Sequence, residues 1–478
     1  MMVIYLILGA VAVFVLTILV RALLFKPEEM PKAVTDMVNI DKDKTVEDMR
    51  AVIRCKTVSY RDEALVDRKE FAKLEEEIKE RFPNVFANMS FEHVGKTGFL
   101  FFKEGKHHDK PKVLMAHYDV VPADPEGWIK PPFEAVLEDG VIWGRGTMDT
   151  KGTFISVLEA AEALFKEGFV PENDLYFSFS GEEEIDGDSC PNIVKVLEEK
   201  GVKPALVLDE GGAVVENTFP GVKKESAMVG IAEKGSVNMD FVIECAGGHA
   251  STPPVHTNMG RLARAVTRIE AKPFKRQLTK PVKEMFNVMG RHSTFGYKII
   301  FANLWCFLPL LDLICKISGG ELNAMMRSTV AVTRSHGSQA YNVLPAKADF
   351  GINLRLLGKD TIESATEYLN KVIDDKDIHI KLVGGMNPSI ASDTDCEEWE
   401  YLKTVIHNTW PEAVVSPYLM MACSDSRHYC RITDRVYRFS PMKMSKEERA
   451  MIHGINERIP VETLIKTVEF YVRFMRGL

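Results

Sequence analysis

The sequence predicts an α/β protein with a helix-covered, mostly parallel sheet and a smaller inserted α+β domain. Between residues 98 and 208, short apolar segments alternate with segments of helical periodicity, which predicts parallel strands joined by helices. From about residue 235 the order becomes strand, helix, two strands, helix and strand, as in a ferredoxin-like unit. The third observation is an uncharged N-terminal run of 18 residues, Val3 to Val20, which predicts a membrane helix.

Length and composition are those of a globular protein with more than one core. The chain has 478 residues, of which 46% are hydrophobic and 27% charged, and its formal net charge is −8. It contains no long Lys/Arg run, so no nucleic-acid partner is expected. The eight cysteines include no C-x-x-C pair, which argues against a zinc ribbon and a disulfide scaffold.

The N-terminal run predicts a transmembrane anchor at residues 3–25. It is longer than the apolar part of a cleavable signal, no basic residue precedes it and no small-x-small site follows it. A cleaved signal is the alternative. Arg21, Lys26 and Lys32 follow the run and favour a cytoplasmic body, although large domains can cross a membrane regardless of charge. We therefore expect a single-pass, membrane-anchored protein and leave the side of the membrane open.

A Pro- and charge-rich linker is expected at 27–44, followed by the first part of the main domain at 45–234. Thr45-Val46-Glu47-Asp48 has the pattern of a capping box and predicts that a helix starts there. A strongly charged amphipathic helix is expected from Arg61 to Arg81. The next strands and helices are predicted at 98–102, 112–117, 153–167, 175–180, 191–200 and 205–208.

The inserted domain is expected at 235–388, and the main domain resumes at 389–478. A segment from Pro273 to Leu322 interrupts the ferredoxin-like order. It contains the apolar run Leu304–Cys315, which is too short to span a membrane and predicts a buried or interfacial helix. The ferredoxin-like elements are predicted at 237–243, 259–270, 330–333, 347–356, 362–374 and 379–383.

Imidazole and carboxylate side chains gather where the predicted strands end, and ligands of such sheets lie beyond those ends. His117 and Asp119 point to the same side of an extended segment, so Asp119 could accept the second ring N–H of a metal-bound His117. Crowded carboxylates repel one another, and two zinc ions that share one carboxylate would resolve the repulsion and leave a Glu as general base. The other groups are Asp149, Glu182-Glu183-Glu184, Asp209-Glu210-Gly211-Gly212 and His453-Gly454-Ile455-Asn456-Glu457.

With these motifs the chain resembles the aminoacylase and carboxypeptidase S (Gly-Xaa carboxypeptidase) family of di-zinc metallopeptidases. Within that family it is most similar to the branch that hydrolyses N-fatty-acyl amino acids. Nine blocks in the family's order, from about residue 45 to the C-terminus, make the resemblance specific. They are MAHYDVVP, PPFEA, GVIWGRGTMDTKG, GEEEIDG, VLDEGG, GGHASTPP, NVLPAKADFGINLR, SDSRHY and HGINERIPVE.

The resemblance implies a set of ligands for two Zn²⁺ ions, with other divalent metals as alternatives. His117 and Asp209 would hold one zinc. Glu184 and His453 would hold the other, and Asp149 would bridge the two ions.

The resemblance also implies roles next to the metals. Glu183 would be the general base and Asp119 the partner of His117, and a cis peptide bond would follow Asp149. The family usually has Asp-Glu-Glu where this chain has Glu182-Glu183-Glu184. A register shifted by one, to Glu182 and Glu183, therefore stays open.

In the inserted domain, which would act as a lid, the resemblance implies substrate-binding residues. His249 would hold the scissile carbonyl, in several relatives from the partner subunit, so a homodimer is possible. Arg355 would hold the substrate carboxylate with its planar fork, and Asn342 is a further candidate for that pocket. Taken singly, His249 and Arg355 could also be an ordinary turn histidine and an exposed strand arginine.

The expected function is hydrolysis of the amide bond in N-acyl amino acids or short peptides with a free C-terminal carboxylate. The alternatives are an aminopeptidase- or deacetylase-type specificity and a non-catalytic, membrane-tethered binding protein. A small-molecule or short-peptide substrate is expected if the chain is a hydrolase of either specificity.

Overall fold

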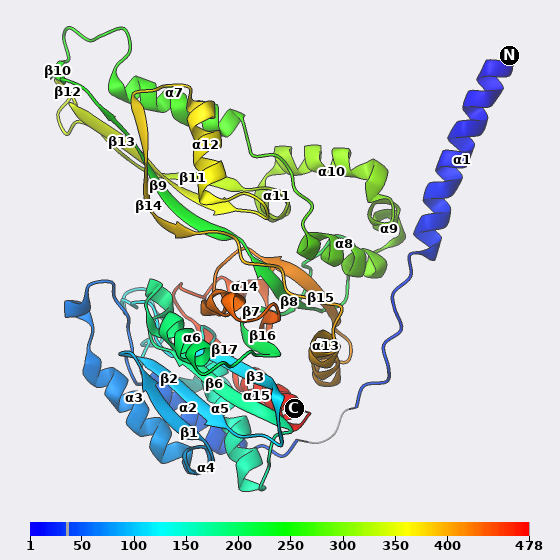
Figure 1. Cartoon of the computed structure of the whole chain (residues 1–478), viewed down its shortest axis with the longest axis vertical. Helices are drawn as coiled ribbons and strands as arrows, with labels where there is room; N and C mark the ends of the chain where they lie inside the picture. Colours follow the sequence, from blue (N-terminus) through cyan, green and yellow to red (C-terminus); the bar gives the residue numbers. More distant parts are fainter. Residues whose placement is uncertain (35–37, 478) are drawn as a thin grey trace.

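The computed structural model describes residues 1–34 and 38–477 and shows an α/β body built on an eight-stranded sheet (Figure 1). In chain order the strands are β1 (Ser90–Val94), β2 (Gly98–Lys103), β3 (His107–His117), β6 (Asn173–Ser180), β7 (Leu206–Val215), β8 (Ser226–Glu233), β15 (Val414–Met420) and β16 (Val436–Met444). Their order in the sheet is β1-β2-β6-β3-β7-β16-β8-β15.

The sheet is mixed: the parallel arrangement expected from the sequence holds for four neighbouring central strands and for one pair at the edge. Strands β6, β3, β7 and β16 run parallel to one another, and β8 is parallel to β15. The pairs β1–β2, β2–β6 and β7–β8 are antiparallel. Because the parallel strands all end at one edge, the residues after β3 and β6 are brought together there.

Helices cover both faces of this sheet, and β3 shows why. Leu114 packs into the larger core, which includes α5, whereas Val113 and Met115 pack into a second core with α6. Alternate residues of a strand point to opposite faces, so a continuous apolar run serves both cores. The helices of this body are α2 (Lys42–Ile53), α3 (Arg68–Arg81), α4 (Pro83–Asn88), α5 (Lys151–Lys166), α6 (Ser189–Glu199), α13 (Glu397–Thr409), α14 (Lys446–Arg449) and α15 (Val461–Arg476).

Helix α2 starts earlier than the predicted capping box at Thr45. Asp41 is the N-cap, and its side chain accepts the backbone N–H of Lys44 at 3.1 Å. Of the predicted linker at 27–44, residues 35–37 lie outside the described residues. Helix α3, in contrast, starts later than predicted, at Arg68 and not at Arg61.

A small three-stranded sheet brings two distant loops of the body together. It consists of β4 (Val136–Glu138), β5 (Val141–Trp143) and β17 (Arg458–Pro460), in the order β17-β5-β4. Because β17 pairs with β5, the segment 453–457 lies against the segment 144–149.

The second large sheet has four antiparallel strands in the order β11-β13-β9-β14. Its elements follow one another in the strand, helix, strand, strand, helix, strand order predicted from the sequence. They are β9 (Gly235–Glu244), α7 (Asn258–Ala271), β11 (Thr329–His336), β13 (Lys347–Leu356), α12 (Ile362–Ile373) and β14 (Ile378–Met386). A short ribbon of β10 (Gly248–His249) and β12 (Val343–Leu344) lies at the far tip (Figure 1).

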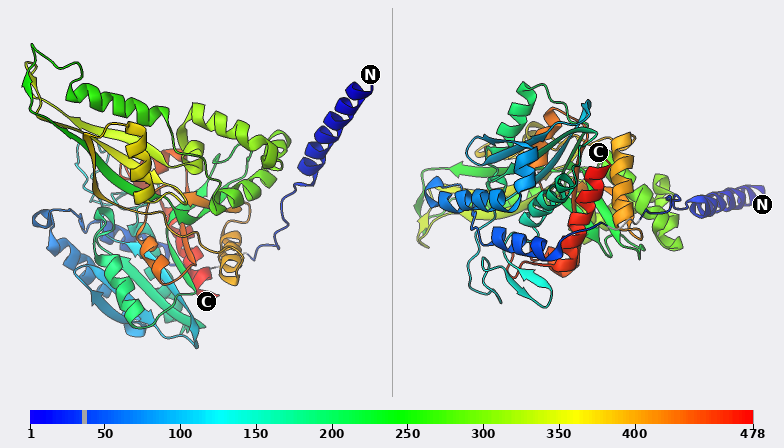
Figure 2. Two further views of the ribbon diagram at one scale, coloured as in Figure 1. Left: turned by 45° about the horizontal axis from the view of Figure 1, so that its top comes forward. Right: turned by 90° about the horizontal axis from the view of Figure 1, so that it is seen from below.

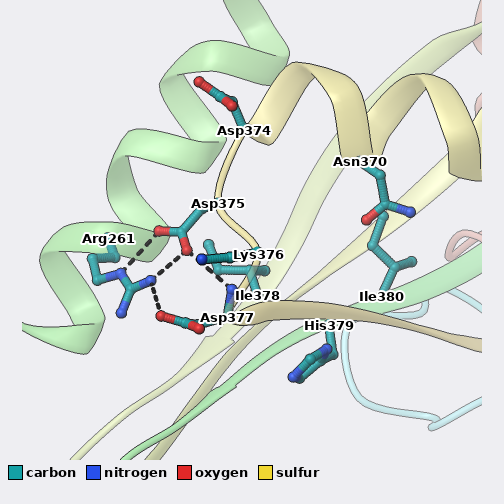
Figure 3. A pocket seen from close by; sticks show the side chains of 9 residues that line it. All are labelled: Arg261, Asn370, Asp374, Asp375, Lys376, Asp377, Ile378, His379 and Ile380. Carbon is teal, nitrogen blue, oxygen red and sulfur yellow. Dashed lines mark hydrogen bonds and ion pairs between the residues drawn. The ribbon is translucent and has the colours of Figure 1, made fainter.

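An ion-paired fork fixes the turn between α12 and β14 against α7. Arg261 of α7 donates to Asp375 at 2.8 Å and to Asp377 at 2.7 Å (Figure 3). Asp374, at the start of this turn, has the left-handed φ of 46°. The bidentate contact ties both helices of the second sheet to the same corner.

Four helices occupy the segment in which the sequence predicted one buried or interfacial helix. They are α8 (Lys280–His292), α9 (Phe295–Phe301), α10 (Leu304–Ser318) and α11 (Gly320–Met326). Helix α8 buries Met285, Phe286 and Met289 in the main core, whereas α10 is largely exposed.

Helix α1 (Met2–Leu24) projects away from the body, with its end beside α9 (Figures 1 and 2). Its bounds agree closely with the predicted helix at 3–25, whose role as an anchor stays a prediction. Among the described residues it is the one single helix that is long and apolar enough to cross a membrane.

Candidate active site

Six side chains converge at the carboxyl edge of the central strands, and we refer to them as the His117 centre. His117 ends β3, Asp149 precedes α5, and Glu183 and Glu184 follow β6 in a short helical turn, Glu183–Ile185. The members of the His117 centre are His117, Asp149, Glu183, Glu184, Glu210 and His453.

Asp149 lies between two histidines. Its Oδ1 is 3.0 Å from Nε2 of His117, and its Oδ2 is 3.0 Å from Nε2 of His453. Glu210 lies 3.4 Å from His117 on one side, and Glu184 lies 2.9 Å from His453 on the other. Two half-sites, each with one imidazole and one glutamate, therefore share the Asp149 carboxylate.

Glu183 and Glu184 face the His117 centre, whereas Glu182 does not. Ligand atoms of Glu183, His117 and Glu210 all lie within 4.8 Å of one another. Glu182 is turned toward Arg68, with 3.7 Å between the charged atoms. This arrangement favours the register with Glu183 and Glu184 over the shifted one.

Asp119 is buried and holds the parts of the His117 centre in place. Its carboxylate accepts the backbone N–H groups of Glu183 and Glu184 at 3.1 and 3.2 Å and the Ser59 hydroxyl at 2.7 Å. Nδ1 of His117 is 3.0 Å from the Asp119 carbonyl oxygen and 3.4 Å from its carboxylate. The predicted pairing with His117 is therefore made mainly through the backbone, which leaves Nε2 facing the centre.

Glu457, which received no role from the sequence, holds the loop before Asp149. This buried carboxylate accepts the Met148 and Asp149 backbone N–H groups at 2.9 and 3.3 Å and pairs with Arg145 at 2.7 Å. The peptide bond between Asp149 and Thr150 is cis, as the resemblance implied. The loop thus presents Asp149 to both histidines.

The structure brings Glu210, and not the predicted Asp209, to His117. Strand β7 continues to Val215, so the two neighbours lie within a strand and point to opposite sides. The buried Asp209 carboxylate accepts the backbone N–H of Ser426 at 3.0 Å. Glu210 is therefore a site candidate that was not predicted. The alternation of side chains along an extended VLDEGG segment could have indicated it, because Asp209 and Glu210 then point to opposite faces.

Among the described residues, the carboxylates of the His117 centre pair with histidines and not with lysine or arginine. In the described part of the chain, none of its four carboxylates forms an ion pair with Lys or Arg. Burial raises the pKa of Glu183 well above its usual range and that of Glu210 to about 8. Hydrogen bonds to Asp149 and Glu184 raise the pKa of His453 to about 10. Imidazole nitrogens and carboxylate oxygens are ligands that divalent zinc prefers, and a bound ion would take the place of the protons that these groups hold.

The His117 centre opens into a cavity of about 460 Å³ whose remaining wall is mostly apolar, with Glu321 and Arg449 as its further charged residues. Methionines come from the body, from α8 and from α11. Cys423 also lines the cavity, and Nη1 of the half-buried Arg355 lies 3.5 Å from its sulfur. The methionines are Met148, Met228, Met285, Met325, Met420 and Met444.

Within one chain the structure does not bring His249 or Asn342 to the His117 centre. His249 lies in β10, at the tip of the second sheet and away from the body (Figure 1). Its Nδ1 is 2.7 Å from the Ser251 hydroxyl, and the Asn342 carbonyl accepts the N–H of Ala250 at 2.9 Å. The two predicted residues are thus neighbours of each other.

Comparison with known proteins finds relatives that match most of the chain. The chain is 34% identical over 480 residues to N-fatty-acyl-amino acid synthase/hydrolase PM20D1 of Xenopus tropicalis, covering 97% of this chain and 93% of that protein. It is 32% identical over 430 residues to probable carboxypeptidase S-like 2 of Dictyostelium discoideum, covering 88% and 82%.

Solved structures share the fold at low sequence identity. An M20 family metallo-carboxypeptidase from Sulfolobus solfataricus has a TM-score of 0.67 at 17% identity and covers 90% of this chain and 98% of that chain. A dinuclear metal-binding peptidase of the M20 family from Bacillus subtilis has a TM-score of 0.56 at 11% identity and covers 91% and 98%.

The model of Peptidase family M20/M25/M40 matches residues 113–477, from within β3 to the end of α15. These residues contain every member of the His117 centre. The chain therefore belongs to peptidase family M20/M25/M40 and is a hydrolytic enzyme.

Proposed function

We propose that the chain is a di-zinc amidase that hydrolyses N-acyl amino acids with a free carboxylate. The observation that carries the proposal is the Asp149 carboxylate between two imidazole–glutamate pairs. His117 and Glu210 would hold one zinc, and His453 and Glu184 the other. The bound ions would polarise the scissile carbonyl and lower the pKa of a water molecule.

Glu183 is the general base in this proposal. It lies next to His117 and Glu210 but belongs to neither of the two imidazole–glutamate pairs that share Asp149. Its carboxylate is therefore free to take a proton from the attacking water. The same group then returns that proton to the leaving nitrogen. Asp119 acts as a positioning residue because it binds the backbone N–H of Glu183.

The methionine-lined cavity would receive the acyl group. Methionine side chains are flexible and polarizable and adapt to apolar ligands of different shape. Arg355, beside Cys423 at the cavity, would bind the substrate carboxylate with its guanidinium group. The relative from Xenopus is named for N-fatty-acyl amino acids, which supports a long acyl chain.

We further propose that the second sheet is a lid and dimerisation domain, and that His249 acts in the site of a second copy. His249 and Asn342 lie together at an exposed tip and face no catalytic group of their own chain.

Mixing inactive Glu183→Gln and His249→Ala chains tests this assignment. Activity should return to about a quarter of wild type, because half of the dimers then contain one complete site. No recovery after subunit exchange would contradict it.

Helix α1 would anchor the enzyme as a single membrane-spanning helix. Its length and hydropathy suit a bilayer, and Arg21 lies near its end. N-terminal sequencing of the purified protein distinguishes the two cases, because a cleaved signal would remove α1 and an anchor would retain it.

Hydrolysis of Gly-Leu, N-acetyl-Leu and N-oleoyl-Phe tests the substrate class. We expect cleavage of the N-acyl amino acids, with N-oleoyl-Phe preferred, whereas a requirement for a free α-amine would indicate an aminopeptidase. Met325→Phe narrows the cavity and should lower the ratio of kcat/KM for the oleoyl over the acetyl substrate about tenfold. Met259→Phe, on the exposed side of α7, is the matched control, and an unchanged ratio in Met325→Phe would contradict the acyl pocket.

A further inference from the structure

Helix α10 turns its apolar residues outward and its acidic residue inward. Asp312 is one of two buried residues in this helix and pairs with Arg327, Lys316 and Arg276. A helix at a water-facing surface shows the opposite pattern. Its outward side chains, between 53% and 79% exposed, are Trp305, Leu310, Leu313, Ile314 and Ile317.

The corner between α9 and α10 is attached to α1. Arg21, the one charged residue of α1, donates to the Asn303 side chain at 3.1 Å. Asn303 in turn donates to the Ile18 carbonyl at 3.1 Å. Further along α1, Phe14 meets Trp305 edge to face, with ring centroids 5.8 Å apart. Figure 1 shows α9 beside the lower end of α1, and α10 running from α9 away from α1.

These contacts place α10 at the depth of the apolar part of α1. Phe14 precedes Arg21 by seven residues, or about 10 Å along a helix. The first turn of α10 therefore lies level with residues that a bilayer would cover. Helices α9 and α10 together are as apolar as a membrane span but meet at 102°, so the pair suits one leaflet and not a crossing.

A cavity of about 510 Å³ lies where α1, α8 and the α9–α10 pair meet. Three cations, Arg21, Lys283 and Arg291, line it, and no acidic residue does. Within the described chain, Arg21 and Arg291 donate to neutral oxygens, and none of the three cations has an acidic ion-pair partner. Arg291 lies over the Phe25 ring at 4.9 Å from its centroid. Apart from Asn287, the rest of the wall is apolar and includes Trp305. A phosphate with attached acyl chains matches this division between cationic and apolar walls.

We propose that α1 and the α9–α10 pair form one membrane-docking surface whose cationic cavity binds the phosphate of an anionic phospholipid. The apolar side chains of α10 lie among the acyl chains of one leaflet. This inference rests on the proposed anchoring of α1 and not on the catalytic activity. Because α8 and α11 flank the pair and also line the active-site cavity, the docking would hold that cavity close to the membrane surface.

Depth-dependent quenching tests the first half of the proposal. The full chain is reconstituted in nanodiscs that contain lipids brominated on their acyl chains, and tryptophan fluorescence is measured. We expect Trp305→Phe to remove at least half of the quenchable signal, while Trp399→Phe, buried in the body, leaves it unchanged. Equal quenching in wild type and Trp305→Phe would overturn the placement of α10. A chain that does not remain with the nanodisc would overturn the anchoring itself.

Lipid retention tests the second half. After extraction in detergent, wild-type protein should retain about one phosphatidylglycerol per chain in preference to phosphatidylcholine. Lys283→Gln combined with Arg291→Gln should lower this retention at least about tenfold, whereas Lys347→Gln, an exposed cation of the second sheet, should not change it.

Three outcomes would overturn the lipid site. These are equal retention of both lipids, unchanged retention in the double variant, and displacement of the lipid by millimolar inorganic phosphate, which would indicate a free-anion site. Hydrolysis of an N-acyl substrate in detergent should be the same in the double variant and wild type, so failure of the lipid site is distinguishable from failure of the proposed function.

Discussion

Two buried acidic clusters in the same body are neutralised in different ways. In the first, which we name the Lys44 cluster, Lys44 lies 2.5 Å from Asp48 and 3.1 Å from Glu159, and Arg81 lies 2.8 Å from Asp48. The His117 centre has four carboxylates and two imidazoles, and the described residues supply it with no Lys or Arg partner. The Lys44 cluster contains its own cations, whereas the His117 centre has carboxylates that a bound metal ion could neutralise.

This difference separates the Lys44 cluster from the proposed catalytic centre better than burial alone does. Both clusters are largely buried, and burial raises the pKa of a carboxyl group in each, to about 8 for Glu159 and for Glu210. The decisive feature is therefore the partner of the charge, not the size of the pKa shift. Four experiments test the comparison.

The largest effect is expected for Glu183→Gln in the His117 centre. The amide keeps the shape of the side chain but cannot accept the proton of water, so kcat should fall by about 10²–10⁴-fold. Zinc content, measured by elemental analysis, should stay at the wild-type level. Glu182→Gln is the matched control and should keep nearly full activity, because Glu182 faces Arg68. Loss of zinc in Glu183→Gln would favour the shifted register.

A second experiment separates the two neighbours on β7. Glu210→Gln should weaken binding of one zinc by about 10–100-fold or more, because a charged ligand is replaced by a neutral one. Asp209→Asn retains an oxygen that can accept the Ser426 N–H and should keep both metal ions. Titration of metal-free protein with zinc measures both affinities. The reverse result would restore Asp209 as the ligand.

Removal of the internal cation should harm stability and leave the metals in place. Lys44→Met leaves Asp48 and Glu159 close together with only Arg81 as a partner. We expect a loss of about 1–3 kcal/mol, less than for a fully buried pair because the Lys44 side chain is 35% exposed. Denaturant unfolding in detergent measures the change. Altered zinc content in this variant would contradict the separation of the two clusters.

The smallest effect is a change in the pH dependence of stability. Burial and the neighbouring Asp48 raise the pKa of Glu159 from 4.5 to about 8. The folded state thus holds this proton more tightly than the unfolded state, and the stabilisation is lost as pH rises from about 5 through 8. Glu159→Gln cannot lose a proton, so its Tm relative to wild type should increase between pH 5 and pH 9. Glu167→Gln, at an exposed position, should show no such trend.

Strong local patterns allowed most of the fold to be predicted. Strand β13 has the predicted bounds, 347–356, because its alternating residues are bounded by polar turns. The end of β7 was not predictable in the same way, because Gly211 and Gly212 are typical of a turn and yet lie within the strand. Asp209 was expected as a ligand from the resemblance alone; the longer strand is what turns Glu210, and not Asp209, toward His117.

The site was predictable where short motifs adjoin strand ends. The structure brings His117, Asp149, Glu183, Glu184 and His453 together, although His453 lies far from the others in the chain. The helices α8 and α11, which complete the cavity, carried no motif and are placed by packing alone. The role proposed for His249 would require a second copy of the chain, which no local pattern can specify.

Elemental analysis of the full chain purified in detergent tests the central claim most directly. The shared position of Asp149 between two imidazole–glutamate pairs predicts about two zinc ions per chain, and a markedly lower content in Asp149→Asn. The Lys44→Met variant should match wild type. Less than about 0.1 metal ion per chain in the wild type, after addition of zinc and dialysis, would contradict the assignment of the His117 centre as a metal site.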